Sequence, residues 1–147
     1  MAVDHTTMPR DDAGMTDSVF SLSTFPAHLD RAAGVIRLEE FDGSPGWYEA
    51  YGEAHAADGD GGRLVSLHTF SEPWDSWEMH PRGDELVVCV AGDIVLHQEI
   101  DGEVRTVELH AGDAIVNRPG VWHTADVTGT CTALFITAGA GTEVRGR

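Results

Sequence analysis

Short segments in which apolar and polar residues alternate fill most of the chain after residue 62. A period of two places successive side chains on opposite faces of a strand. We therefore predict strands over residues 63–70, 85–91, 94–100, 104–109, 114–116, 121–127 and 131–137. Turn signals separate these segments at intervals of about 8–12 residues, which is typical of an all-β sandwich or barrel.

Glycine-containing turns support this arrangement. Asp101-Gly102 is a strong hairpin signal, because glycine readily takes the positive φ that a tight primed turn requires. Ala-Gly-Asp at 91–93 and at 111–113, and Thr128-Gly129, separate other predicted strands. We expect a β-barrel whose strands run antiparallel.

The pattern before residue 63 has a different period. Trp47, Tyr48, Tyr51 and His55 have the spacing of one helix face, and Ser44 followed by Pro45 suits a helix start, so we predict a helix over about 45–57. The run Asp58-Gly59-Asp60-Gly61-Gly62 ends it as a turn cluster that lacks the spacing of an EF-hand calcium loop.

The first forty residues carry weaker signals. Residues 1–17 are polar and acidic without any period, and they are predicted to be a disordered leader. Residues 18–41 contain short apolar pieces broken by Pro26 and Gly34, which suit edge strands or an arm lying across the barrel. We expect residues 18–147 to form a single domain.

The segment 85–91 is apolar on both faces. Glu85, Val87 and Cys89 point to one side, while Leu86, Val88 and Val90 point to the other. A strand of this kind must be covered on both sides. Either the N-terminal arm or a second subunit supplies the outer cover, and a symmetric homodimer is the expected assembly.

Composition excludes several classes of partner. The 147 residues contain 9 Lys plus Arg against 25 Asp plus Glu, which gives a formal net charge of −16. Binding to nucleic acid or to an anionic membrane surface requires clustered cations, so neither is an expected partner. No signal peptide and no apolar run of about 20 residues is visible. The two cysteines, Cys89 and Cys131, are predicted to be buried free thiols. Because free thiols are typical of a reducing compartment, we expect a cytoplasmic protein.

Candidate chemistry gathers in the stretch 77–85. Glu78 and His80 are two residues apart, so on a strand their side chains leave the same face. Glu85 begins the next strand after a Pro-Arg-Gly-Asp turn, and His123 follows another tight turn far along the chain. Two imidazoles and up to two carboxylates form a competent site for a divalent first-row metal.

These residues resemble the two motifs of the cupin superfamily. His80, Glu85 and Gly92 match the second His, the Glu and the Gly of the first motif. Gly112 and the run Pro-Gly-Val-Trp-His at 119–123 resemble the second motif, with His123 as its ligand. The resemblance spans about residues 64–137 and implies a double-stranded β-helix, or jelly roll, of the kind found in small homodimeric cupins.

Three departures from the family pattern matter. Glu78 stands where the family has its first His, Arg118 stands at the motif-two proline with Pro119 one place later, and Val127 replaces the usual Asn. Glu78 remains open as a fourth ligand, as a general base or as an exposed strand residue. His80 as a strand-end surface residue and Glu85 as a turn-capping carboxylate are the structural alternatives.

The resemblance implies a metal-binding protein, with Fe, Mn, Ni or Zn held by Glu78, His80, Glu85 and His123. One hypothesis is a metal-dependent enzyme of the dioxygenase or isomerase type that acts on a small organic molecule, with Glu78 as its catalytic residue. The other is a non-catalytic cupin that binds or senses a small-molecule ligand.

Four of the histidines outside this pattern have no ligand-like spacing; they are His55, His68, His97 and His110. The strand that carries His68 can nevertheless flank a pocket. Trp74, Trp77 and Trp122 are close to the motif residues in sequence and serve either the core or the wall of an apolar pocket.

Overall fold

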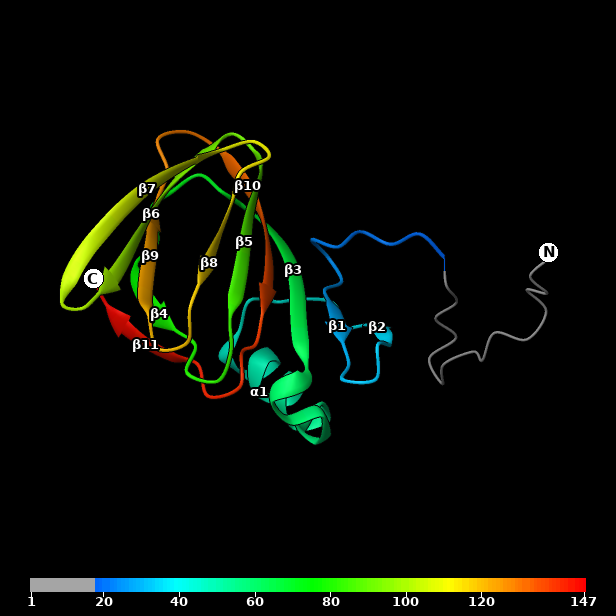
Figure 1. The fold of residues 1–147 in the computed structure, drawn as a ribbon. Helices are drawn as coiled ribbons and strands as arrows, with labels where there is room; N and C mark the ends of the chain where they lie inside the picture. The colour runs from blue at the N-terminus through cyan, green and yellow to red at the C-terminus, as the bar shows by residue number, and fades with distance from the viewer. Residues whose placement is uncertain (1–17) are drawn as a thin grey trace, which may run out of the picture.

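Two facing antiparallel sheets make up the barrel in the computed structural model, which describes residues 18–147 (Figure 1). The predicted leader over residues 1–17 lies outside the described residues. The first sheet has the order β2 (Val35–Arg37), β1 (Ala27–Leu29), β3 (Arg63–Phe70), β10 (Cys131–Thr137), β5 (Glu85–Ala91) and β8 (Ala114–Asn117). The second has the order β11 (Glu143–Gly146), β4 (Ser76–Met79), β9 (Trp122–Asp126), β6 (Asp93–Ile100) and β7 (Glu103–His110). The fold is a double-stranded β-helix with one short α-helix.

Every strand that the alternation predicts is present, three of them with the predicted bounds. β11 was not predicted, because four exposed residues at an edge are too short for a periodic signal. The pieces before residue 41 form β1 and β2, and β1 pairs with β3 at the edge of the first sheet. The N-terminal arm therefore extends a sheet and does not lie across β5.

The helix α1 spans Pro45–Ala54 and is shorter than predicted. Its start matches the sequence signal, because the Ser44 hydroxyl accepts a hydrogen bond from the Trp47 backbone N–H at 3.1 Å. His55 takes a non-helical φ of −114°, and the chain continues as the 3-10 helix η1 (Ala56–Gly61), in which Gly59 has a positive φ. The glycine-rich cluster thus forms a tight turn before β3.

The core lies between the two sheets and is made by the inward-facing residues of each strand. Both cysteines are free and buried in it, with their Sγ atoms 3.9 Å apart. The fully buried core includes Val87, Cys89, Ile94, Leu96, Ala125, Cys131 and Ala133.

Two turns use positive φ angles as the sequence predicts. Asp101 (φ 52°) and Gly102 (φ 78°) both have positive φ, which is the conformation of a type I′ hairpin. Gly92 has φ 74°, and a Cβ there would overlap the backbone oxygen of Thr130. Only glycine fits at position 92.

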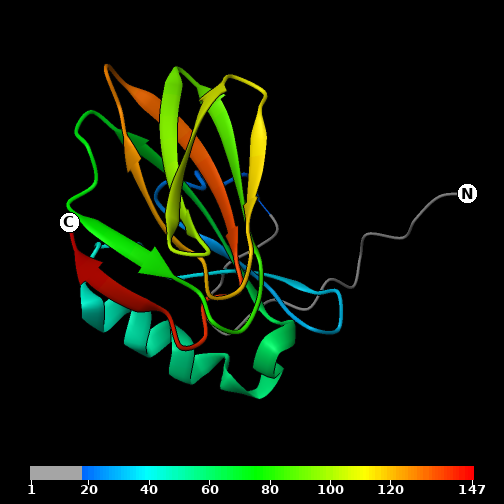
Figure 2. The same ribbon diagram turned by 60° about the vertical axis from the view of Figure 1, so that its left-hand side comes forward.

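α1 lies across one end of the barrel, the lower end in Figures 1 and 2. η1 leads from α1 into the start of β3, and the start of β3 pairs with the end of β10, which in turn pairs with the start of β5. The helix is therefore at the end where β5 begins. Within residues 18–147, no helix is long and apolar enough to span a membrane.

Candidate metal centre

Three strands bring the candidate ligands to one end of the barrel. Glu78 lies on β4, directly opposite His123 of β9 in the pairing of these strands. His80 follows the last residue of β4, and Glu85 is the first residue of β5. The turn between β4 and β5 therefore returns the chain so that His80 and Glu85 face each other.

The four side chains meet in one place. Glu85 lies between the two imidazoles, with its Oε2 at 3.2 Å from His80 Nε2 and its Oε1 at 3.2 Å from His123 Nε2. Ligand atoms of Glu78, His80 and His123 all lie within 4.8 Å of one another. His80, Glu85 and His123 are 4%, 3% and 0% exposed, so these are not surface residues at a strand end.

The tautomer of His80 follows from its neighbour. The Thr142 hydroxyl donates to the backbone oxygen of Gly139 at 2.7 Å, so its single proton is used there. At 2.8 Å from His80 Nδ1, the Thr142 oxygen must therefore accept, which places a proton on Nδ1. In the neutral imidazole this leaves a lone pair on Nε2.

His123 is held in the same tautomer. Its Nδ1 lies 3.1 Å from the backbone oxygen of Val121, which can only accept, so Nδ1 carries a proton. Within residues 18–147, neither His80 Nε2 nor His123 Nε2 has a hydrogen-bond partner, although both are buried. Two lone pairs that face a carboxylate at 3.2 Å require a cation between them, either a metal ion or added protons. The residues present therefore fit a divalent metal, with each imidazole oriented through its other nitrogen.

Glu85 is fixed by residues that the sequence motifs did not indicate. The Asn117 side-chain amide donates to Glu85 Oε1 at 3.0 Å, and the Thr137 hydroxyl donates to Oε2 at 2.7 Å. Gln98 orients Asn117 by donating to its side-chain oxygen at 2.7 Å. Burial alone would raise the pKa of Glu85, but its contacts with His123 and His80 lower it well below the usual value. Glu85 is therefore an ionised carboxylate.

Glu78 has the opposite electrostatic character. Burial, followed by the charge of Glu85, raises the pKa of Glu78. Burial lowers the pKa of His123, but its contact with Glu85 outweighs this and raises the value. The pKa values of the two carboxyl groups are thus shifted in opposite directions. This arrangement separates a fixed anion from a group that can exchange protons.

Tyr48 of α1 lies within the electrostatic influence of this site. Burial first, and then the charges of Glu78 and Glu85, raise the pKa of its phenol. Its ring contacts Phe41 and Trp47, and its side chain remains 46% exposed.

The other aromatic and histidine residues lie elsewhere. His68 packs inside the barrel against Phe41, Phe70 and Phe135, and burial lowers its pKa. Trp77 and Trp122 alternate with Glu78 and His123 along their strands and leave from the opposite face, where the guanidinium of Arg145 lies over both rings. Those two tryptophans therefore do not form a wall of the site.

Comparison with known proteins gives a match to the region of the chain that contains the candidate site. The sequence profile of the cupin domain matches residues 69–138, which contain all four candidate ligands. The match supports assignment of this region of the chain to the cupin superfamily. No curated protein matches its sequence significantly.

Several solved structures are similar to part of the chain at low sequence identity. A cupin-2 domain protein from Shewanella frigidimarina is 21% identical, with coverage of 51% of this chain and 69% of that protein and a TM-score of 0.45. A conserved protein with a double-stranded β-helix domain from Klebsiella pneumoniae is 22% identical over 58% of this chain and 76% of its own, with a TM-score of 0.48. Hydroquinone 1,2-dioxygenase from a Sphingomonas species is 16% identical over 51% of this chain and 59% of its own, with a TM-score of 0.43. At this level the similarity concerns the fold alone.

Proposed function

We propose that this cupin is a metal-dependent enzyme of the dioxygenase or isomerase type that acts on a small organic molecule. His80, Glu85 and His123 are the proposed ligands of a divalent ion, and Glu78 is either the fourth ligand or the catalytic base. The observation that carries the proposal is the pair of buried Nε2 atoms, both without a hydrogen-bond partner and both facing Glu85.

Fe, Mn, Ni or Zn in this site would supply Lewis-acid or oxygen-activating chemistry. Glu85 would contribute a fixed negative charge, since Asn117 and Thr137 hold its two oxygens. Glu78 would take up and release a proton near the reacting atoms, because its raised pKa brings it closer to neutral pH.

A non-catalytic cupin that binds or senses a small molecule is the second candidate. One observation favours it: Glu85 contacts both imidazoles directly, so protonation of the histidines can also balance its charge. In that case the barrel would hold a ligand without a metal. The two candidates differ in whether a divalent ion binds with defined stoichiometry at His80 and His123.

The test is a titration of chelator-treated, untagged protein with Mn²⁺, Ni²⁺ and Zn²⁺, and with Fe²⁺ under anaerobic conditions, followed by calorimetry. The enzyme proposal expects binding that His123→Ala abolishes, and oxygen uptake or solvent-hydrogen exchange with some members of a panel of small phenols and carbonyl compounds. Glu78→Gln then separates its two roles: loss of turnover with metal retained indicates a base, and loss of metal indicates a ligand. Binding that is unchanged in His123→Ala would contradict the proposal.

We also propose that the chain forms a homodimer through the outer face of the first sheet. Leu86 and Val88 are only partly buried and Val90 is 50% exposed, and the neighbouring strand adds Leu134 and Ile136 to the same face. Val88→Lys should convert the dimer to a monomer by light scattering. Val104→Lys, a matched change on β7, should leave the mass unchanged. A monomeric parent protein would contradict the proposal.

A further inference from the structure

A second cluster of metal-ligating side chains lies outside the barrel, beside α1. It consists of His28 on β1, His55 at the end of α1 and Asp58 in η1, and one ligand atom of each lies within 4.8 Å of the others. His28 precedes the other two by about thirty residues, so no spacing motif could reveal the cluster. It is formed because β1 pairs with β3, to which η1 leads directly.

His28 is held in a fixed orientation at the centre of this cluster. Its side chain is 2% exposed, its Nε2 lies 2.6 Å from Asp58 Oδ2, and its Nδ1 lies 2.7 Å from the Tyr51 hydroxyl. A Cβ at Gly62 would lie 2.8 Å from His28 Cε1, so the glycine leaves room for the ring. A metal-binding imidazole has this arrangement, with one nitrogen toward the ion and the other fixed by a polar partner.

His55 supplies a second, available imidazole. Its ring stacks on that of His28 with centroids 3.9 Å apart, and no hydrogen bond to its ring nitrogens is found within residues 18–147. Asp58 is the third group; its other oxygen accepts a 3.5 Å hydrogen bond from the Arg31 backbone N–H.

We propose that His28, His55 and Asp58 form a second divalent-metal site, of a class suited to Zn²⁺, Co²⁺ or Ni²⁺. Two imidazoles and one carboxylate are ligands for these ions. Donor atoms around a tetrahedral ion lie about 3.3 Å apart, between the 2.6 Å of the His28–Asp58 contact and the 4.8 Å limit of the cluster. Binding therefore requires a small separation of His28 from Asp58 and a rotation of the His55 ring out of its stack.

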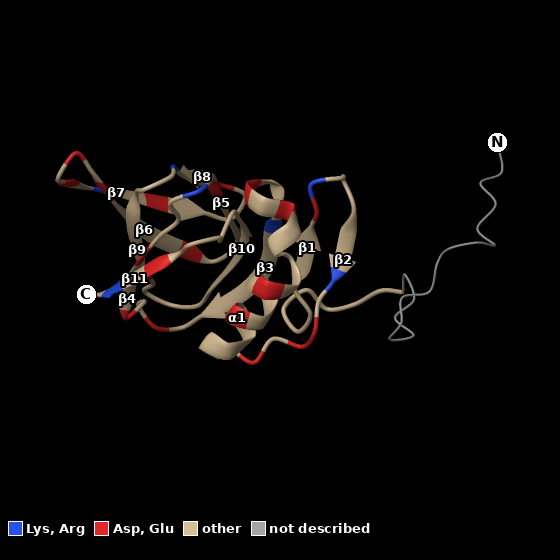
Figure 3. Cartoon of the chain, turned by 90° about the horizontal axis from the view of Figure 1, so that it is seen from below, with Lys and Arg blue, Asp and Glu red and all other residues tan. Residues whose placement is uncertain are grey.

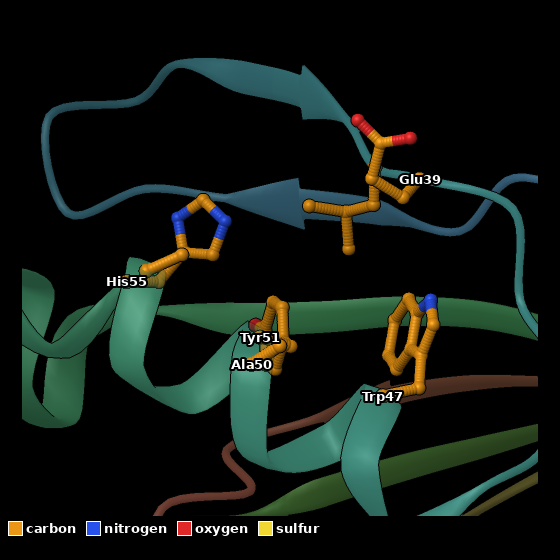
Figure 4. Close-up of a pocket in the computed structure, with 7 residues that line it drawn as sticks. Glu39, Trp47, Ala50, Tyr51 and His55 are labelled. Carbon is orange, nitrogen blue, oxygen red and sulfur yellow. The ribbon is translucent and has the colours of Figure 1, made fainter.

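The structure also provides a path of entry. A cavity of about 240 Å³ lies between α1 and the segment that follows β2, and His55 and Tyr51 belong to its wall. Figure 4 shows His55 at one end of this cavity and the Glu39 carboxylate on the side opposite α1. Figure 3 shows Asp and Glu positions on α1 and on the adjoining loops, and negative charge near the site would raise the local concentration of cations.

An ion at this site would join β1, the end of α1 and η1. Because α1 lies across the end of the barrel, the second ion would hold the helix in place there. The site does not depend on the proposed function, because none of its ligands belongs to the barrel site.

The experiment is a Zn²⁺ titration of the full chelator-treated chain by calorimetry, with Co²⁺ absorption to report ligand geometry. The parent protein should bind two ions per chain, His55→Ala one and His123→Ala one, and the double variant none. His110→Ala removes a surface histidine beside Asp93 and should retain both ions. His55 makes no side-chain hydrogen bond in the described chain, so its replacement should leave the fold intact, which circular dichroism checks.

The proposal fails if the parent binds one ion that only His123→Ala removes, or if a second ion persists in folded His55→Ala protein. Failure of the proposed barrel function gives a different result: His123→Ala loses no ion while His55→Ala loses one. The two proposals are therefore tested separately by the same set of variants.

Discussion

The Thr142 hydroxyl and His80 Nδ1 are 2.8 Å apart although 62 residues separate them in the sequence, and this contact determines which nitrogen of His80 faces Glu85. Thr142 immediately precedes β11, which pairs with the strand that carries Glu78. The proposed metal site would thus depend on a hydroxyl group from outside both cupin motifs.

Thr142→Val should therefore weaken metal binding at the barrel site. Without the hydroxyl, His80 Nδ1 loses its acceptor, and removal of such a partner costs about 10–100-fold in metal affinity. Thr142→Ser keeps the hydroxyl and should bind as the parent does. Calorimetry with Zn²⁺ in a His55→Ala background measures this site alone. Equal affinities for the Val and Ser variants would contradict the assigned role.

Asn117→Ala should destabilise the protein by about 1–3 kcal/mol, because the buried Glu85 loses a hydrogen bond and Gln98 loses its acceptor. Urea unfolding of metal-free protein measures the free energy of unfolding. Thr132→Ala, which removes a surface hydrogen bond to Thr69, is the control and should cost no more than about 0.5 kcal/mol. Similar values for the two variants would show that the Asn117 network adds nothing.

Glu78→Gln should change the pH dependence of stability in the metal-free protein. The pKa of Glu78 is raised in the fold, so its protonated form stabilises the protein at low pH and this contribution is lost as pH rises through the folded pKa. Glutamine cannot ionise. The variant should therefore have the higher melting temperature at about pH 7.5, and the difference should shrink toward about pH 4. A difference that does not vary with pH would contradict the raised pKa.

Gly92→Ala should be more damaging than Gly102→Ala. Both positions have positive φ, which costs an alanine about 1–2 kcal/mol. Position 102 has open space around it, whereas at position 92 the new Cβ would overlap the backbone of Thr130. We expect the Gly92 variant to lose at least about 1 kcal/mol more in urea unfolding. Equal losses in the free energy of unfolding would mean that the backbone near Thr130 can move to accommodate the new Cβ at little cost.

The alternating pattern and the glycine turns were sufficient to predict the barrel. The motif residues were sufficient to predict that Glu78, His80, Glu85 and His123 form one site. The supporting residues could not be predicted in this way. Asn117 and Thr137 are single polar residues at strand ends, and Thr142 lies in a loop, so none of them belongs to a periodic pattern or a recognisable spacing. Their roles depend on strand register, which the sequence alone does not define at single-residue accuracy. For the same reason, the sequence did not predict the His28–His55–Asp58 cluster.

The order in which the chain emerges during synthesis adds a consequence to the pairing of β3 with β10. Leu64 can pair with His28 of β1 as soon as β3 is made, but its pairing with Thr137 and the contact of His80 with Thr142 can form only later. A growing chain can thus hold three of the four candidate barrel ligands well before residue 123, yet it cannot fix His80 until residue 142 has left the ribosome. If the proposed site binds an ion, its capture in the final geometry would therefore be one of the last events in the maturation of this protein, and early exposure to metal would meet an incomplete set of ligands.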